Sequence, residues 1–239
     1  MRRMIHLAVL MSFAGSIVWA EEMPAVREGG FEDAFSVNED EFSSSGRNAY
    51  FVLEPGYTLS FTGQDEDEGE AATLVISVLN ETRRVAGVET RVVEERESVG
   101  GQLKEVSRNY VAISRRTSDV FYFGEKVDMY EDGRIVGHGG SWLAGQDGNR
   151  YGLLMPGTIR VGRRYFQEVA PNVAMDRAEI VGASGTMTTE AGTFESVLRI
   201  EETTPLEPGV KEYKYYAPGV GLIQDGNLKL VSVLSKGAD

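Results

Sequence analysis

Hydrophobic and polar residues alternate over much of the chain. In the run "YTLSFTG", Tyr57, Leu59 and Phe61 fall on one face. Alternation with a period of two is typical of half-buried β-strands. Turn signals such as Ala86-Gly87 and Gly100-Gly101 separate the runs at short intervals, which predicts antiparallel hairpins. The pattern of an amphipathic helix of three turns is not seen after the first twenty residues.

These runs predict a single all-β domain over residues 48–239. About ten or more strands are expected at the usual strand length of about 5–6 residues. An open flat sheet of that width would expose its edges, so we expect an antiparallel curved sheet that forms a half-barrel or a barrel-like fold. The segment 137–157 is rich in glycine and longer than a hairpin needs, which predicts a long Gly-rich loop.

The beginning of the chain has a different character. Residues 1–20 combine a basic start, an apolar core and a small-residue cleavage site, which predicts a secretory signal peptide. Residues 21–47 are acidic and are expected to form a flexible lead-in. We therefore predict an exported bacterial protein, periplasmic or extracellular, without a membrane span.

Charge and cysteine content narrow the chemistry. The chain has 37 acidic and 24 basic residues and a net charge of −13, which argues against nucleic acid as a partner. It has no cysteine, so a lipidated cysteine anchor, disulfides and thiolate chemistry are excluded. His138 is the single histidine outside the predicted signal peptide, so a zinc site of the usual His/Cys type is not expected.

Two kinds of enzyme chemistry were tested against the motifs. "HGGS" at residues 138–141 is similar to the oxyanion loop of esterases, but the Gly-x-Ser-x-Gly nucleophile elbow is missing. Acidic residues near Glu125 and Asp128 leave open a carbohydrate-active or calcium-dependent enzyme. No cofactor is expected unless calcium binds at Asp128, Asp132 and Asp147, where Asp-Gly pairs are also what tight turns require.

Several motifs taken together resemble a family. They are "YFGE" (122–125), "GSWLAGQDG" (140–148), "MPG" (155–157), "VGRRYFQE" (161–168) and "TPLEPGVKEYKYYAPGVGLI" (204–223). The set resembles a family of exported bacterial β-rich proteins without an assigned activity, over roughly residues 48–232. The resemblance implies a curved-sheet or half-barrel fold and export, and it implies no catalytic residue. Asn149, Arg150 and Tyr151 depart from it, because smaller residues are expected there.

These observations favour a non-enzymatic binding or scaffold protein, with enzymatic activity left open. The expected occupant is an apolar small molecule, a lipid or an envelope protein in the concavity of the sheet. The candidate ligand-binding residues are Trp142, Tyr122, Glu125 and Met155. The loop that carries Trp142 could be a lid over a ligand or a hydrophobic plug, and the sequence does not decide between them.

Overall fold

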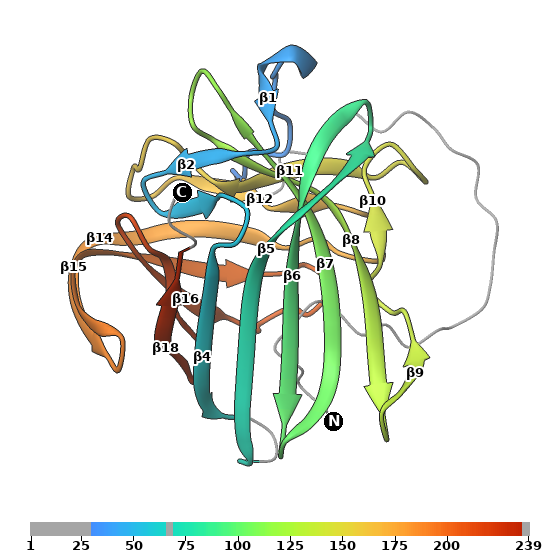
Figure 1. The fold of residues 1–239 in the computed structure, drawn as a ribbon. Coiled ribbons are helices and arrows are strands. Elements are labelled where there is room, and N and C mark those ends of the chain that lie inside the picture. The colour runs from blue at the N-terminus through green and yellow to red at the C-terminus, as the bar shows by residue number, and fades with distance from the viewer. Residues whose placement is uncertain (1–29, 66–68, 236–239) are drawn as a thin grey trace.

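The computed structural model describes residues 30–65 and 69–235 (Figure 1). The predicted signal peptide and the first part of the lead-in, residues 21–29, lie outside the described residues. The described residues form eighteen strands and one turn of 3-10 helix, η1 (Glu39–Glu41). The strands are β1 (Phe42–Ser43), β2 (Gly46–Asn48), β3 (Phe51–Leu53), β4 (Thr58–Gln64), β5 (Ala71–Val85), β6 (Val88–Val99), β7 (Gln102–Ser114), β8 (Val120–Glu131), β9 (Arg134–Gly137), β10 (Trp142–Leu143), β11 (Arg150–Met155), β12 (Arg164–Phe166), β13 (Glu168–Val169), β14 (Arg177–Thr189), β15 (Gly192–Thr203), β16 (Glu212–Ala217), β17 (Gly221–Asp225) and β18 (Leu228–Leu234).

One antiparallel sheet contains most of these strands. Its order is β12-β14-β15-β16-β17-β18-β4-β5-β6-β7-β8-β11-β13. Figure 1 shows β4 to β8 side by side, with β14 and β15 running crosswise to them. The sheet is nearly closed into a barrel, which confirms the predicted fold class.

The hairpins of the long strands follow from their turn residues. Ala86 and Gly87 join β5 to β6 with φ angles of 46° and 83°. Gly100 and Gly101 join β6 to β7 with φ angles of 58° and 77°. Two consecutive positive φ angles match the right-handed twist of the flanking strands, so both predicted turns are confirmed.

The barrel closes through residues 164–169, the closure segment, which contains β12 and β13. β12 pairs with β14 at one end of the sheet, and β13 pairs with β11 at the other. Only Gln167 separates β12 from β13. Where this segment lies beside β11, a Cβ atom on Gly152 would lie 2.3 Å from the carbonyl oxygen of Gln167. Glycine at residue 152 therefore permits the approach that closes the barrel.

The segment 30–47 differs from the flexible lead-in that its composition suggested. The amide of Phe166 donates to the carbonyl oxygen of Glu32, and β1 pairs with β7. The ring of Phe42 packs edge-on against Phe121 and Phe123 at 5.5 and 5.2 Å. Scattered aromatic residues give this acidic segment enough apolar surface to pack on the barrel.

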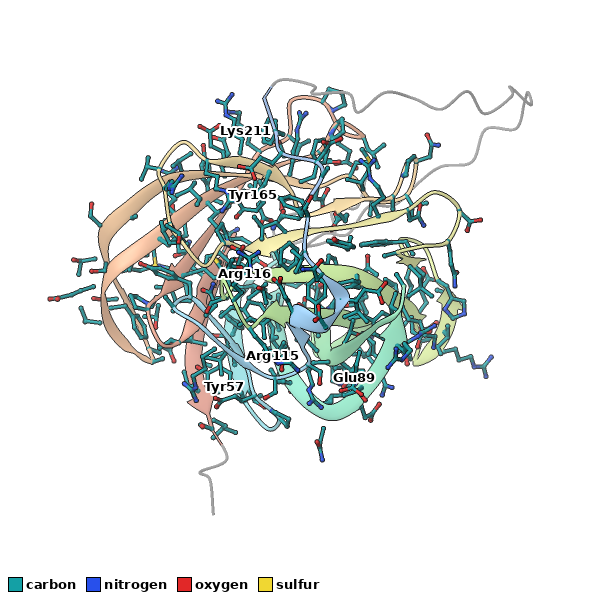
Figure 2. All side chains as sticks on the ribbon, turned by 90° about the horizontal axis from the view of Figure 1, so that it is seen from above. Tyr57, Glu89, Arg115, Arg116, Tyr165 and Lys211 are labelled. Atoms are coloured by element: carbon teal, nitrogen blue, oxygen red, sulfur yellow. The ribbon has the colours of Figure 1, made fainter. Side chains whose placement is uncertain are left out.

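Polar contacts at the β7–β8 turn hold the same segment. The guanidinium of Arg115 donates to the carbonyl oxygen of Asp40, and Arg116 pairs with Glu41 at 2.9 Å. Figure 2 shows both arginines beside this segment, seen from above. Tyr151, one of the residues that depart from the family pattern, donates its hydroxyl to the carbonyl oxygen of Phe35.

The Gly-rich segment 137–157 is partly ordered into sheet. β10 pairs with β8, with Trp142 opposite Glu125, and β11 pairs with β8 further along. Irregular stretches remain before β10 and between β10 and β11. Trp142 is 4% exposed, so its side chain belongs to the hydrophobic core.

Candidate functional site

The interior of the barrel holds a cavity of about 160 Å³. Side chains from strands on both sides of the barrel line it, and most of them belong to two chemical groups. The apolar and aromatic lining residues are Phe51, Val52, Tyr57, Leu59, Leu74, Ile76, Val78, Val93, Val111, Tyr122, Leu154, Met155, Tyr216, Val220 and Leu222. The acidic lining residues are Glu95, Glu97, Glu105, Glu125, Glu168, Asp176 and Asp225.

The two groups are separated along the strands β6 and β7. Every second residue of a strand faces the same side, so Val93, Glu95 and Glu97 form one inward row on β6. On the antiparallel strand β7, Asn109 pairs with Val93 and Glu105 pairs with Glu97. Both strands therefore change from apolar or neutral to acidic in the same direction along the barrel.

The lining on β16 and β17 also changes from apolar to acidic along the barrel. On β17, Leu222 lines the cavity before Asp225. Tyr216 and Lys214 of β16 pair with Leu222 and Asp225, respectively. Repulsion from Asp225 contributes to the raised pKa of Glu97, so the acidic ends of the two walls face each other across the interior. On β6, β7 and β17 the lining is thus apolar or neutral at one end and acidic at the other.

Glu125 is the most isolated acid in the lining. It is 2% exposed, and neither carboxyl oxygen has a hydrogen-bond partner in the described part of the chain. The neighbouring hydroxyl of Tyr122 donates its single proton to Oδ1 of Asn109. Desolvation by burial raises the pKa of Glu125 well above its usual range, repulsion from Glu105 adds to that rise, and the adjacent Tyr122 hydroxyl opposes it.

Glu97 and Glu105 form a pair of facing acids. They are directly opposite each other in the β6–β7 ladder, where like charges are destabilising. Desolvation raises the pKa of Glu97 to about 8, and repulsion from Glu105 adds to it. Desolvation raises the pKa of Glu105 to about 7, with a further contribution from Glu95. At neutral pH this pair therefore holds part of its protons.

Glu95 is the lining glutamate of β6 that keeps accessible surface. Its side chain is only half-buried by surface area, yet desolvation is the largest cause that raises its pKa to about 7. Partial exposure and strong desolvation of Glu95 agree if its accessible surface faces the cavity and not the exterior of the protein. Lys214 acts in the opposite direction and limits the rise.

Glu168 and Asp176 are hydrogen-bonded to each other on the wall near the closure segment. The amide of Asp176 donates to Oε1 of Glu168 at 3.0 Å. Desolvation raises the pKa of Glu168 well above its usual range and raises that of Asp176 to about 6. The lysine nearest to this group, Lys214, is already paired with Glu202 at 3.0 Å and lies 3.7 Å from Asp225.

The structure brings three of the four predicted ligand-binding residues together. Tyr122, Glu125 and Met155 line the cavity. Trp142 packs behind Tyr122, with ring centroids 5.4 Å apart in an edge-on arrangement. Trp142 is therefore a buried neighbour of the wall, and its role in ligand binding remains a prediction.

The three predicted calcium-binding residues lie apart from this cavity. Asp128 is on the face of β8 that carries Lys126, and these two side chains form an ion pair at 2.9 Å. Asp132 and Asp147 are exposed residues of turns, with φ angles of 49° and 51°. Among the described residues, no group of three or more His, Asp or Glu side chains is placed to hold a metal ion. The calcium prediction rests on the sequence alone.

Comparisons with known proteins add little to this geometry. No protein-family model and no curated protein matches the chain. The chain is similar to a crystal structure, at 2.22 Å resolution, of a Bacteroides fragilis NCTC 9343 protein described as inferred to be exported and as having a YmcC-like fold. The identity is 15%, the coverage is 79% of this chain and 100% of that chain, and the TM-score is 0.38. A likeness at this TM-score carries no argument about this chain.

The residues described include no helix of the length and apolar character needed to cross a membrane.

Proposed function

We propose that this protein binds a small molecule with an apolar part inside its barrel and has no catalytic role. The observation that carries the proposal is the interior cavity of about 160 Å³ with an apolar end. Cavities that bind small molecules are mostly lined by apolar and aromatic side chains, with a few polar groups that orient the ligand. A small molecule or a lipid chain fits this interior better than an envelope protein, because the lining belongs to the inside of the barrel wall.

The alternative enzyme used the acids near Glu125 and Asp128. These two side chains do not share a site, because Glu125 lines the cavity and Asp128 is paired with Lys126 on the other face of β8. A glycosidase needs two carboxyl groups that flank one bond, so this pair does not support that reaction. The non-enzymatic proposal therefore has the stronger support.

Binding of the neutral fluorophore N-phenyl-1-naphthylamine (NPN) tests the proposal. Trp142 is the single tryptophan outside the predicted signal peptide, and it packs on Tyr122, which lines the cavity. We expect NPN to bind with saturation and to quench the emission of Trp142 by energy transfer. Ile76→Phe should weaken binding about tenfold, since the half-buried Ile76 has free surface toward the cavity.

The matched control is Ile135→Phe, which makes the same change on β9 at a side chain that is 49% exposed and outside the lining. It should leave NPN affinity unchanged. Native mass spectrometry of protein purified without denaturation is the complementary measurement, and a bound small molecule would identify the natural ligand. If NPN does not bind, or if both variants weaken binding equally, the cavity is not a binding site.

A further inference from the structure

The acidic end of the cavity requires an explanation beyond the binding of an apolar molecule. Resting on the proposed function, we propose that the ligand carries a protonated amine, which Glu125 and the neighbouring acids bind while its apolar part occupies the other end. The ligand would be a small cationic amphiphile. The proposal concerns the identity of the ligand, and it can fail while the binding function holds.

The charge balance of the lining points to a cation. Seven carboxyl groups line the cavity, and no basic side chain is among the described lining residues. The nearby Lys214 lies 3.7 Å from Asp225, which is one of the seven, and 3.0 Å from Glu202 outside the lining, so it does not balance the other six. Buried carboxyl groups without a counter-charge are costly, so a bound cation would be stabilised by several of them.

Unused hydrogen-bond acceptors point to a donor on the ligand. Both carboxyl oxygens of Glu125 and Oε2 of Glu105 lack hydrogen-bond partners, and the two residues are 2% and 8% exposed. An ammonium group has three donors and no acceptor, so it matches the oxygens of these carboxyl groups once their protons are released. Charge-assisted hydrogen bonds of this kind are about twice as strong as neutral ones.

The arrangement of the acids favours an organic cation over a metal ion. A metal ion needs several ligand oxygens at distances near 2–2.6 Å, and no such group of three occurs in the described part of the chain. The acids are instead distributed around the interior, on β6, β7, β8, β13 and β17 and at Asp176. The adjacent apolar end gives a hydrocarbon chain a place that a bare ion would not use.

Binding of the amine should be coupled to proton release. The groups that act on Glu125 are Glu95 of β6, Glu105 of β7, Tyr122 of β8, Glu168 of β13 and Asp176. The pKa values of Glu95 and Glu105 are raised to about 7, that of Asp176 to about 6, and Lys214 counteracts the rise at Glu95. A cation favours the ionised carboxylates, so the affinity for an amine should increase between pH 5.5 and pH 8.5.

Displacement of NPN by three matched eight-carbon compounds tests the inference. At pH 8.5 we expect octylamine to bind at least about tenfold more tightly than octan-1-ol, and octanoate to bind most weakly. Glu125→Gln should remove most of the advantage in affinity that octylamine has over octan-1-ol. Glu195→Gln, the same change at an exposed residue of β15, is the control and should alter neither affinity.

Lowering the pH in the same displacement assay separates the contribution of charge to ligand affinity from that of hydrophobic contact. Between pH 8.5 and pH 5.5 the affinity for octylamine should fall at least about tenfold, while that for octan-1-ol stays within about twofold. If octan-1-ol and octylamine bind equally at pH 8.5, the amine inference is wrong and the binding function stands. If NPN binds to neither the wild type nor Glu125→Gln, the proposed function itself is wrong.

Discussion

Lowering the pH from 8.5 to 5.5 is expected to raise the melting temperature of the ligand-free protein by about 5 °C or more. The cause lies in the cavity acids. Desolvation raises the pKa of Glu97 to about 8 and the pKa values of Glu95 and Glu105 to about 7. Each pKa unit corresponds to about 1.4 kcal/mol of unfolding free energy at most, and coupling between these acids reduces their sum.

The sign follows from proton counting. Unfolded glutamates have a pKa of about 4.3, whereas these three retain protons up to a pH of about 7 or 8 in the folded state. Between those values the folded state binds more protons than the unfolded state. The free energy of unfolding therefore decreases as the pH rises through this window. For a chain of this size, about 1 kcal/mol shifts the melting temperature by about 2–4 °C.

Two variants identify the responsible groups. Glu97→Gln should flatten the dependence of the melting temperature on pH, because it removes the group with a pKa of about 8. Glu54→Gln should not, because Arg47 lowers the pKa of that exposed carboxyl and its titration lies below the window. Differential scanning calorimetry over the pH range measures both. A melting temperature that rises with pH would show that the cavity acids are ionised and satisfied in the ligand-free protein.

The fold class could be predicted because it depends on local signals. Alternation in "YTLSFTG" indicates one buried face, and the structure places Leu59 and Phe61 in the core. The turn at Gly100-Gly101 requires residues that tolerate positive φ angles. Both signals lie within a few residues of the feature that they predict. The aromatic residues of the segment 30–47 were also visible, but its acidic composition outweighed them in the prediction.

The acidic end of the cavity was only partly predictable. The sequence points to Glu125 as a candidate ligand-binding residue, but it does not point to Glu95, Glu97 or Glu105. A signal was present in "VVEERESV", where Val93, Glu95 and Glu97 occupy every second position of one strand. A glutamate on the same strand face as inward apolar residues lies either at the edge of the core or in a buried functional site. What the sequence could not supply is the β6–β7 register that places Glu97 opposite Glu105.

The closure of the barrel was not predictable, because it depends on residues far apart in sequence. Gly152 and Gln167 come together only when the closure segment lies antiparallel beside β11. Nothing local distinguishes Gly152 from the other glycines of the segment 137–157. Gly152 is important because backbone atoms would meet any side chain at this position.

Gly152→Ala is expected to lower the free energy of unfolding by about 3 kcal/mol or more. A Cβ atom at this position would lie 2.3 Å from the carbonyl oxygen of Gln167 and 2.6 Å from that of Phe166. Both are backbone atoms of the closure segment, so no side chain can rotate away to make room. β11 or the closure segment has to move, which weakens the pairing of Tyr151 with Glu168.

Gly182→Ala is the matched control, because Gly182 also lies in a strand of the sheet but has open space. A Cβ atom there would be 3.9 Å from the Cβ of Arg199, an ordinary contact. That variant should stay within about 1 kcal/mol of the wild type or be slightly more stable, since alanine reduces the entropy of the unfolded chain. Urea unfolding measures both, and NPN binding by Gly152→Ala should weaken together with its stability. Equal stability of the two variants would mean that the closure segment tolerates displacement, and the barrel would then be held by its long hairpins alone.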